Sequence, residues 1–174
     1  VIMFAEHGAA NPYESICIEA PLSGIPVGGC SPPPTQPVHN PPIFFHYSRP
    51  MASHNSLCQI FANYDVPDQF GYPGANQGLG ELLRPEAYKV FVEISDDGVS
   101  CSTGGQTFTD SNTVLAGEQV AADFDAALLA FSSTQFGTAG FRRYIWHSII
   151  GMAANTPATA PWLPTDPMTT AECP

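Results

Sequence analysis

A proline- and glycine-rich stretch near the N-terminus constrains the fold of this chain more than any other feature. Residues 24–42 contain the run SPPPTQPVHNPP. Proline has no backbone N–H and restricts the residue before it, so such a run is excluded from helix interiors and from central strands. We expect polyproline or irregular structure there, acting as a wrapping segment or linker, with the regular elements placed on either side.

Short apolar runs on both sides of this stretch predict strands at residues 1–5, 15–20 and 43–47. After Ser53, a plausible helix cap, apolar residues follow at helical spacing and stop before Pro67. The residues in this pattern are Leu57, Ile60, Phe61 and Tyr64. A short helical turn is expected near Leu79 to Leu83, closed by a proline.

The clearest strand pattern covers residues 88–94, where apolar and polar side chains alternate. We expect Tyr88, Val90, Val92 and Ile94 to share one face of this strand and Lys89 and Glu93 to lie on the other. The sequence Asp96-Asp97-Gly98 favours a hairpin turn into residues 99–103, and Gly104-Gly105 favours a second turn into residues 107–109.

The strongest helix pattern runs from Glu118 to Ser132, with one apolar stripe formed by Val120, Phe124, Leu128 and Phe131. A last long strand is expected at residues 141–150, followed by a Thr- and Pro-rich tail at residues 155–174. The predicted core combines residues from all of these elements: Phe45, Leu57, Phe61, Val90, Val92, Phe124, Leu128, Ile145 and Ile149.

The order of these elements predicts an α+β fold. Regular βαβ alternation, the signature of a parallel sheet, does not occur. We therefore expect a single domain over residues 1–174, with a mainly antiparallel sheet, two or three packed helices, stapling disulfides and long Pro-rich loops.

The charge balance of the chain excludes some classes of partner. Lys and Arg number 5 against 16 Asp and Glu, which gives a formal charge of −11. Extended nucleic-acid binding needs clustered cations and is not expected, and neither is attraction to an anionic membrane surface. The longest apolar run, residues 126–131, is far shorter than the ~20 residues that span a bilayer, so we expect no membrane span.

Five cysteines occur at positions 17, 30, 58, 101 and 173, with no CxxC pair. Zinc-ribbon and thioredoxin-like patterns are therefore missing, and disulfides are the better interpretation. Cys17 with Cys30 is the first expected bridge and Cys101 with Cys173 the second, which leaves one thiol that is free or bonded to another chain. The first residues, Val-Ile-Met-Phe, are typical of a processed chain, so we expect a secreted, extracellular protein whose signal peptide has been removed.

Motifs for nucleophilic, phosphate-loop or metal chemistry are missing from the sequence, and the five histidines have no ligand spacing, so no metal or cofactor is expected. One constellation could share a sheet face: His46, Glu93, Arg142, Arg143 and His147. A Glu–His acid–base pair beside arginine suits phosphodiester transfer. The alternative function is thus a secreted, metal-independent hydrolase resembling a small endoribonuclease. A structural interpretation competes strongly with this one: Arg142, Arg143 and Glu93 as salt-bridging residues on a solvated sheet face, and His147 as a buried, hydrogen-bonded histidine.

The preferred hypothesis is a non-enzymatic extracellular structural or interaction protein, with a self-assembling subunit as one form. An apolar strand at residues 1–4 could complete the sheet of a neighbour. A leftover cysteine and a low proportion of charged residues, 12%, agree with assembly. The expected partner is a second copy or another extracellular protein, and whether the chain is an enzyme stays open.

Overall fold

The computed structural model describes residues 1–8, 15–111, 113–150, 156–157, 159–161 and 163. These residues form a mixed structure with four helices, several small sheets and two disulfides. They divide into two compact units: unit 1 is Val1–Met51 with Ile60–Leu83, and unit 2 is Ala52–Gln59 with Arg84–Pro174. The prediction of a single domain is therefore not confirmed.

Unit 1 contains little regular structure. Strand β1 (Ile2–Phe4) pairs in parallel with β2 (Phe45–Tyr47). Residues 24–39 contain only turns, bends and coil, as the prolines predict. The strand expected at residues 15–20 is irregular instead. The N-terminal strand is thus paired within its own chain.

The core of unit 1 surrounds Tyr47, which is fully buried. Its hydroxyl donates to the backbone oxygens of Asn63 and Val66, and its ring meets Phe4 edge-on at 5.1 Å between centroids. Helix α1 (Ser56–Ala62) ends in this unit, and α2 (Leu79–Leu82) follows as the predicted short turn. The other buried apolar side chains here are Phe44, Ile60, Leu79 and Leu83.

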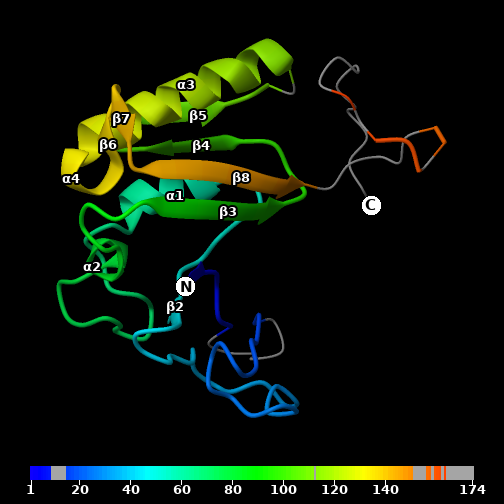
Figure 1. Ribbon diagram of the computed structural model, residues 1–174, viewed down its shortest axis with the longest axis vertical. Helices are drawn as coiled ribbons and strands as arrows, with labels where there is room; N and C mark the ends of the chain where they lie inside the picture. Colours follow the sequence, from blue (N-terminus) through cyan, green and yellow to red (C-terminus); the bar gives the residue numbers. More distant parts are fainter. Residues whose placement is uncertain (9–14, 112, 151–155, 158, 162, 164–174) are drawn as a thin grey trace. The chain divides into compact units, whose positions relative to one another are not determined.

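Unit 2 is built around two strands that are far apart in sequence (Figure 1). Strand β3 (Lys89–Ser95) pairs in parallel with β8 (Tyr144–Ile150) along all seven residues of each strand. A parallel pair needs a long crossover connection, and here residues 96–143 supply it. Because this longest pairing is parallel, the prediction of a mainly antiparallel sheet is not confirmed.

The crossover contains two hairpins. Strands β4 (Ser100–Thr103) and β5 (Gln106–Thr109) pair through the predicted Gly104-Gly105 turn, where both glycines have positive φ. The hairpin expected at Asp96-Asp97-Gly98 is wrong, because β3 pairs with β8 and β4 with β5. The short strands β6 (Gly137–Thr138) and β7 (Phe141–Arg142) form the second hairpin.

Helix α3 (Val114–Phe131) lies along β5 in Figure 1 and packs against it. The Thr113 hydroxyl caps this helix by accepting from the backbone N–H of Ala116. Helix α4 (Ser133–Phe136) follows directly. The predicted stripe on α3 is buried at Val120, Phe124 and Leu128, whereas its last member, Phe131, is 42% exposed.

The predicted core is partly wrong. Leu57, Phe124 and Leu128 are buried, and Phe45 and Phe61 are half-buried. The four remaining members, Val90, Val92, Ile145 and Ile149, are exposed. All four lie on one face of the β3–β8 sheet. The prediction placed this face in the core, whereas the opposite face of the sheet points inward.

Two disulfides bridge the described residues. Cys17–Cys30 in unit 1 confirms the first expected bridge. In unit 2, Cys101 bonds to Cys58, so the expected Cys101–Cys173 bridge is wrong. The backbone N–H of Ser100 donates to the carbonyl of His54, which holds β4 beside the start of α1. Cys173 and most of the predicted tail lie outside the described residues.

None of the helices in the described part of the chain is long and apolar enough to cross a membrane.

Candidate functional site

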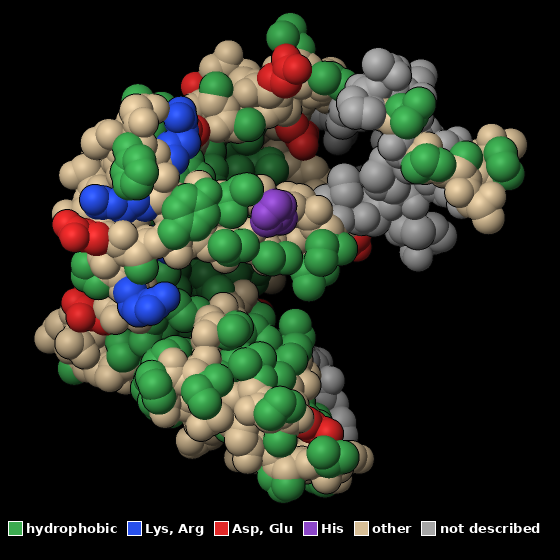
Figure 2. All heavy atoms as spheres, in the orientation of Figure 1, with side chains coloured by type: hydrophobic (Ala, Val, Ile, Leu, Met, Phe, Trp, Pro, Cys, Tyr) green, Lys and Arg blue, Asp and Glu red, His purple; other side chains and the backbone are tan. Residues whose placement is uncertain are grey.

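The outer face of the β3–β8 sheet is an exposed apolar surface (Figure 2). The pairs Val90 with Ile145, Val92 with His147 and Ile94 with Ile149 cover it. The exposure of its apolar side chains ranges from 40% at Ile145 to 79% at Ile94. Figure 2 shows a histidine over β8 surrounded by apolar side chains. We call this surface the outer face: Tyr88, Val90, Val92, Ile94, Ile145, His147 and Ile149.

The size of the outer face is unusual for a strand pair. Its six apolar side chains, each about half exposed, present roughly 600 Å² of apolar surface, the upper end of what monomers ordinarily show. None of its seven residues is Asp, Glu, Lys or Arg. Apolar patches of this size mark binding surfaces more often than isolated exposed residues do.

The inner face of the same sheet carries aromatic rings. Phe91 of β3 stacks on Trp146 of β8 with ring centroids 5.0 Å apart. Phe124 of α3 meets Trp146 edge-on at 5.2 Å, and Phe108 of β5 meets Phe124 at 5.8 Å. Edge-to-face and offset-stacked rings are the favoured geometries of aromatic pairs. This aromatic cluster determines which side of the sheet is buried.

Polar groups on the inner face have partners. The Lys89 ammonium donates to the backbone oxygen of Gln135 at 2.7 Å. Burial lowers the pKa of Lys89, and Arg143 and Arg84 lower it further. The Glu93 carboxylate accepts from the Ser56 and Ser148 hydroxyls and from the Trp146 indole N–H. Because their charged groups are hydrogen-bonded, Lys89 and Glu93 of β3 can point inward while the valines of the same strand point outward.

Both arginines of the predicted catalytic set bind protein atoms. The Arg142 guanidinium forms a fork with the Asp125 carboxylate, with N···O distances of 2.6 and 2.7 Å. Tyr144 donates to the same carboxylate at 2.5 Å. Hydrogen bonding from Arg142 is the main reason that the pKa of Asp125 is lowered. Arg143 donates to two backbone oxygens at residues 133 and 134.

Glu93 and His147 do not share a face. Glu93 pairs in register with Ser148 and points to the inner side, whereas His147, the residue before Ser148 in β8, lies on the outer face. His46 belongs to unit 1. Glu93 and His147, the predicted acid–base pair within unit 2, therefore lie on opposite sides of the sheet.

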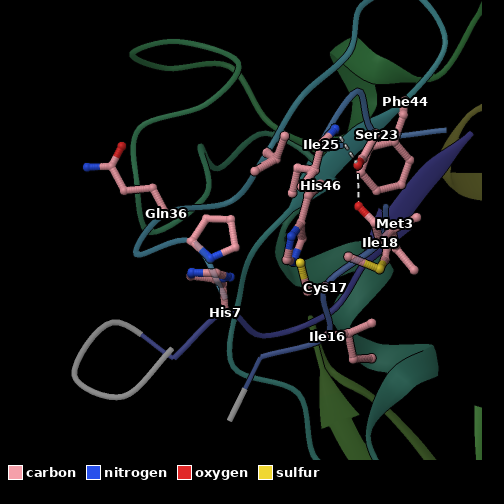
Figure 3. A pocket seen from close by; sticks show the side chains of 12 residues that line it. Met3, His7, Ile16, Cys17, Ile18, Ser23, Ile25, Gln36, Phe44 and His46 are labelled. Atoms are coloured by element: carbon pink, nitrogen blue, oxygen red, sulfur yellow. Dashed lines mark hydrogen bonds between the residues drawn. The ribbon is translucent and has the colours of Figure 1, made fainter. Parts of the chain in front are cut away.

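His46 lines a small, mostly apolar cavity in unit 1 (Figure 3). Its Nε2 lies 3.0 Å from the carbonyl oxygen of Ala5. Burial is the largest effect on the pKa of His46 and lowers it, while the Ala5 hydrogen bond acts in the opposite direction. The cavity is small, with a volume of about 10 Å³ in which the centre of a water molecule can lie, so it holds roughly one water molecule.

His7 is the second histidine of this cavity, and sequence reasoning missed it. It is only 3% exposed, and both of its ring nitrogens are without a hydrogen-bond partner. An unpaired buried polar group ordinarily costs about 1–3 kcal/mol. His7 stands 39 residues from His46, and no motif spacing connects them. The parallel pairing of β1 with β2 brings their neighbourhoods together.

A comparison of the chain with protein-family models, with curated proteins and with solved structures found no match.

Proposed function

We propose that this protein is a non-enzymatic, extracellular structural or interaction protein whose copies associate through the outer face. The observation that carries the proposal is the row of exposed β-branched side chains on β3 and β8. Leaving that much apolar surface in water is unfavourable, at about 25 cal/mol per Å². A partner that covers the face recovers this free energy.

The area of the outer face suits a second copy. Two such faces packed on each other would remove roughly 1,200 Å² from water, above the ~1,000 Å² expected of a specific interface. A two-fold dimer presents the same patch from both subunits, so a uniform apolar face is self-complementary. Sheets pack face to face in this manner at a spacing of about 10 Å.

Charge also favours association through this face. The chain carries a formal charge of −11, so two copies repel each other across most of their surfaces. The outer face holds no Asp, Glu, Lys or Arg, and His147 lies at its middle. Contact here avoids placing like charges opposite one another.

The N-terminal strand is a weaker candidate interface than the sequence suggested. Strand β1 is hydrogen-bonded to β2, and the Val1 ammonium donates to the backbone oxygen of Ile43 at 2.6 Å. Deleting residues 1–5 would remove the partner of β2 as well as an exposed end. Such a deletion would therefore not separate an effect on assembly from an effect on folding.

Two disulfides support an extracellular setting. Such bonds persist in oxidising compartments and are rare where thiols are kept reduced. The hydrolase alternative has no comparable support, because Glu93 and His147 lie on opposite faces and Arg142 is bound to Asp125. An assay for metal-independent RNA cleavage by the purified protein tests that alternative, and cleavage that needs Glu93 or His147 would favour it.

Sedimentation equilibrium of three proteins tests the proposal. We expect wild type to form a dimer as concentration rises, and Val92→Lys to stay a monomer because a buried, unpaired ammonium is costly. Val114→Lys is the matched control, since Val114 is similarly exposed on α3, away from the outer face. Circular dichroism checks that each variant is folded. A wild-type monomer at high concentration, or a Val92→Lys dimer, contradicts self-association.

A further inference from the structure

His147 lies at the centre of the outer face. It pairs in register with Val92, and each of the two is the middle residue of a seven-residue strand. The pairs next to it on the same face are aliphatic: Val90 with Ile145, and Ile94 with Ile149. Its side chain is exposed, and in the described part of the chain no hydrogen bond or ion pair engages its imidazole. Packing within one chain therefore does not account for a polar ring at this position.

The other titratable groups of the two strands do not surround this imidazole. Three of them point to the inner side of the sheet and are hydrogen-bonded there: Lys89, Glu93 and Tyr144. Tyr88 and Asp96 lie just before and just after β3, each four residues from Val92. At about 3.3 Å per residue, each is roughly 13 Å along the strand from the centre of the face. No carboxylate of these strands is therefore placed to pair with a protonated His147.

A two-fold axis through the middle of the outer face brings His147 against its own copy. A two-fold interface uses the same patch of both subunits, so a residue beside the axis meets the same residue of the partner. Sheets packed face to face are about 10 Å apart, a gap that two imidazoles extending from opposite sides can fill. A neutral imidazole has one N–H donor and one acceptor nitrogen, so the two rings can share a hydrogen bond. The second copy then supplies the partner that one chain lacks.

A polar pair at the centre also fixes how the two faces align. Two uniformly aliphatic faces can pack in several alignments, whereas a buried polar pair is satisfied in only one, as single polar residues show in coiled coils. We propose that two copies meet with His147 paired to His147 across a two-fold axis, and that protonation of this pair separates them. This inference rests on the self-association proposed above and specifies its geometry and its dependence on pH.

Acid acts differently on the monomer and on the dimer. Histidine changes its charge between about pH 5 and pH 8. In the monomer the exposed ring takes up a proton in contact with water, whereas in the dimer two protonated rings would repel each other away from water. Because the monomer binds more protons than the dimer, a fall in pH favours the monomer. Acid also reduces the formal charge of −11, which by itself favours association, so a loss of association in acid points to the imidazoles.

Sedimentation equilibrium at about pH 7.5 and at about pH 5.0 measures this dependence. We expect the dissociation constant of the wild-type dimer to rise at least about tenfold in acid, because two protons must be released per dimer. His147→Gln has an amide that can pair with its copy and does not titrate, so its association should not weaken in acid. His54→Gln, at an exposed histidine outside the outer face, is the matched control and should behave as wild type does. Circular dichroism checks that each protein is folded at both pH values.

An exchange of charge at position 147 tests the two-fold contact itself. His147→Asp alone and His147→Lys alone should stay monomers, because each places like charges opposite one another. A mixture of the two proteins should associate more tightly than either alone. The same two changes at Val114, on the exposed side of α3, are the control, and each of those variants should associate without the other.

The outcomes separate this inference from the self-association on which it rests. A wild-type monomer at about pH 7.5 would contradict self-association itself. Equal association of wild type in both buffers, acid dissociation that persists in His147→Gln, or a charge-exchanged mixture no tighter than its components would overturn the role of His147 and leave the outer face as an interface. If His147→Gln does not associate at either pH, His147→Leu, which extends the aliphatic row, takes its place in the comparison.

Discussion

The two faces of the β3–β8 sheet differ in a way that simple alternation does not predict. Alternation predicts that the aliphatic face is buried and the charged face exposed, whereas the structure shows the reverse. The inner face holds Lys89 and Glu93 among aromatic rings, and every one of their charged groups has a hydrogen-bond partner. The outer face holds valines and isoleucines that are exposed. In this sheet, aromatic packing and satisfied polar groups determine which side is buried.

This difference indicates what each face does. On the inner face, rings such as Phe91 and Trp146 stack and give the unit its stability. The outer face contributes little to the fold of one chain, because its side chains stay in water. The proposed association of two copies would give this exposed apolar surface a role.

The largest effect expected from this comparison is on the inner side. Phe124→Ala removes the ring that packs on Trp146 and should lower the free energy of unfolding by about 3–5 kcal/mol. Phe131→Ala, the same change on the exposed end of α3, is the control and should cost about 1 kcal/mol or less. Urea denaturation measures both. Equal losses would mean that the inner face is not the core of unit 2.

A smaller effect is expected at Glu93. Glu93→Gln places an amide where hydroxyl and indole donors converge, so at least one donor loses its acceptor, at about 1–3 kcal/mol. The control is Glu118→Gln at an exposed position of α3, for which we expect a change within about 0.5 kcal/mol. If the two variants are equally stable, Glu93 does not anchor the inner face.

Local features of the fold could be predicted from the sequence. The irregular segment at residues 24–39 follows from the backbone restrictions of proline, and the buried stripe of α3 follows from helical spacing. The turn at Gly104-Gly105 and the Cys17–Cys30 bridge are also local. Each depends on residues that are close in sequence, where the physical restrictions are strong.

Features that join distant segments could not be predicted in the same way. Alternation in β3 shows which residues share a face, but not which face is covered. Phe91 was the available signal, since it lies on the same face as Lys89 and Glu93, and its partner Trp146 is 55 residues away. The parallel pairing of β3 with β8 and the Cys58–Cys101 bridge likewise depend on long-range contacts.

The smallest change in stability is expected for a single thiol on the outer face, and this thiol reports directly whether a second copy docks there. Val92→Cys in the Cys173→Ser background should cost little stability, because Val92 is exposed. In dilute solution we expect this thiol to react with a maleimide as fast as Val114→Cys on α3. At high concentration, where we propose that two copies associate, we expect only the thiol at position 92 to be protected. Protection already in dilute solution would show that the face is buried within one chain, and reactivity that does not change with concentration would contradict docking of a second copy there.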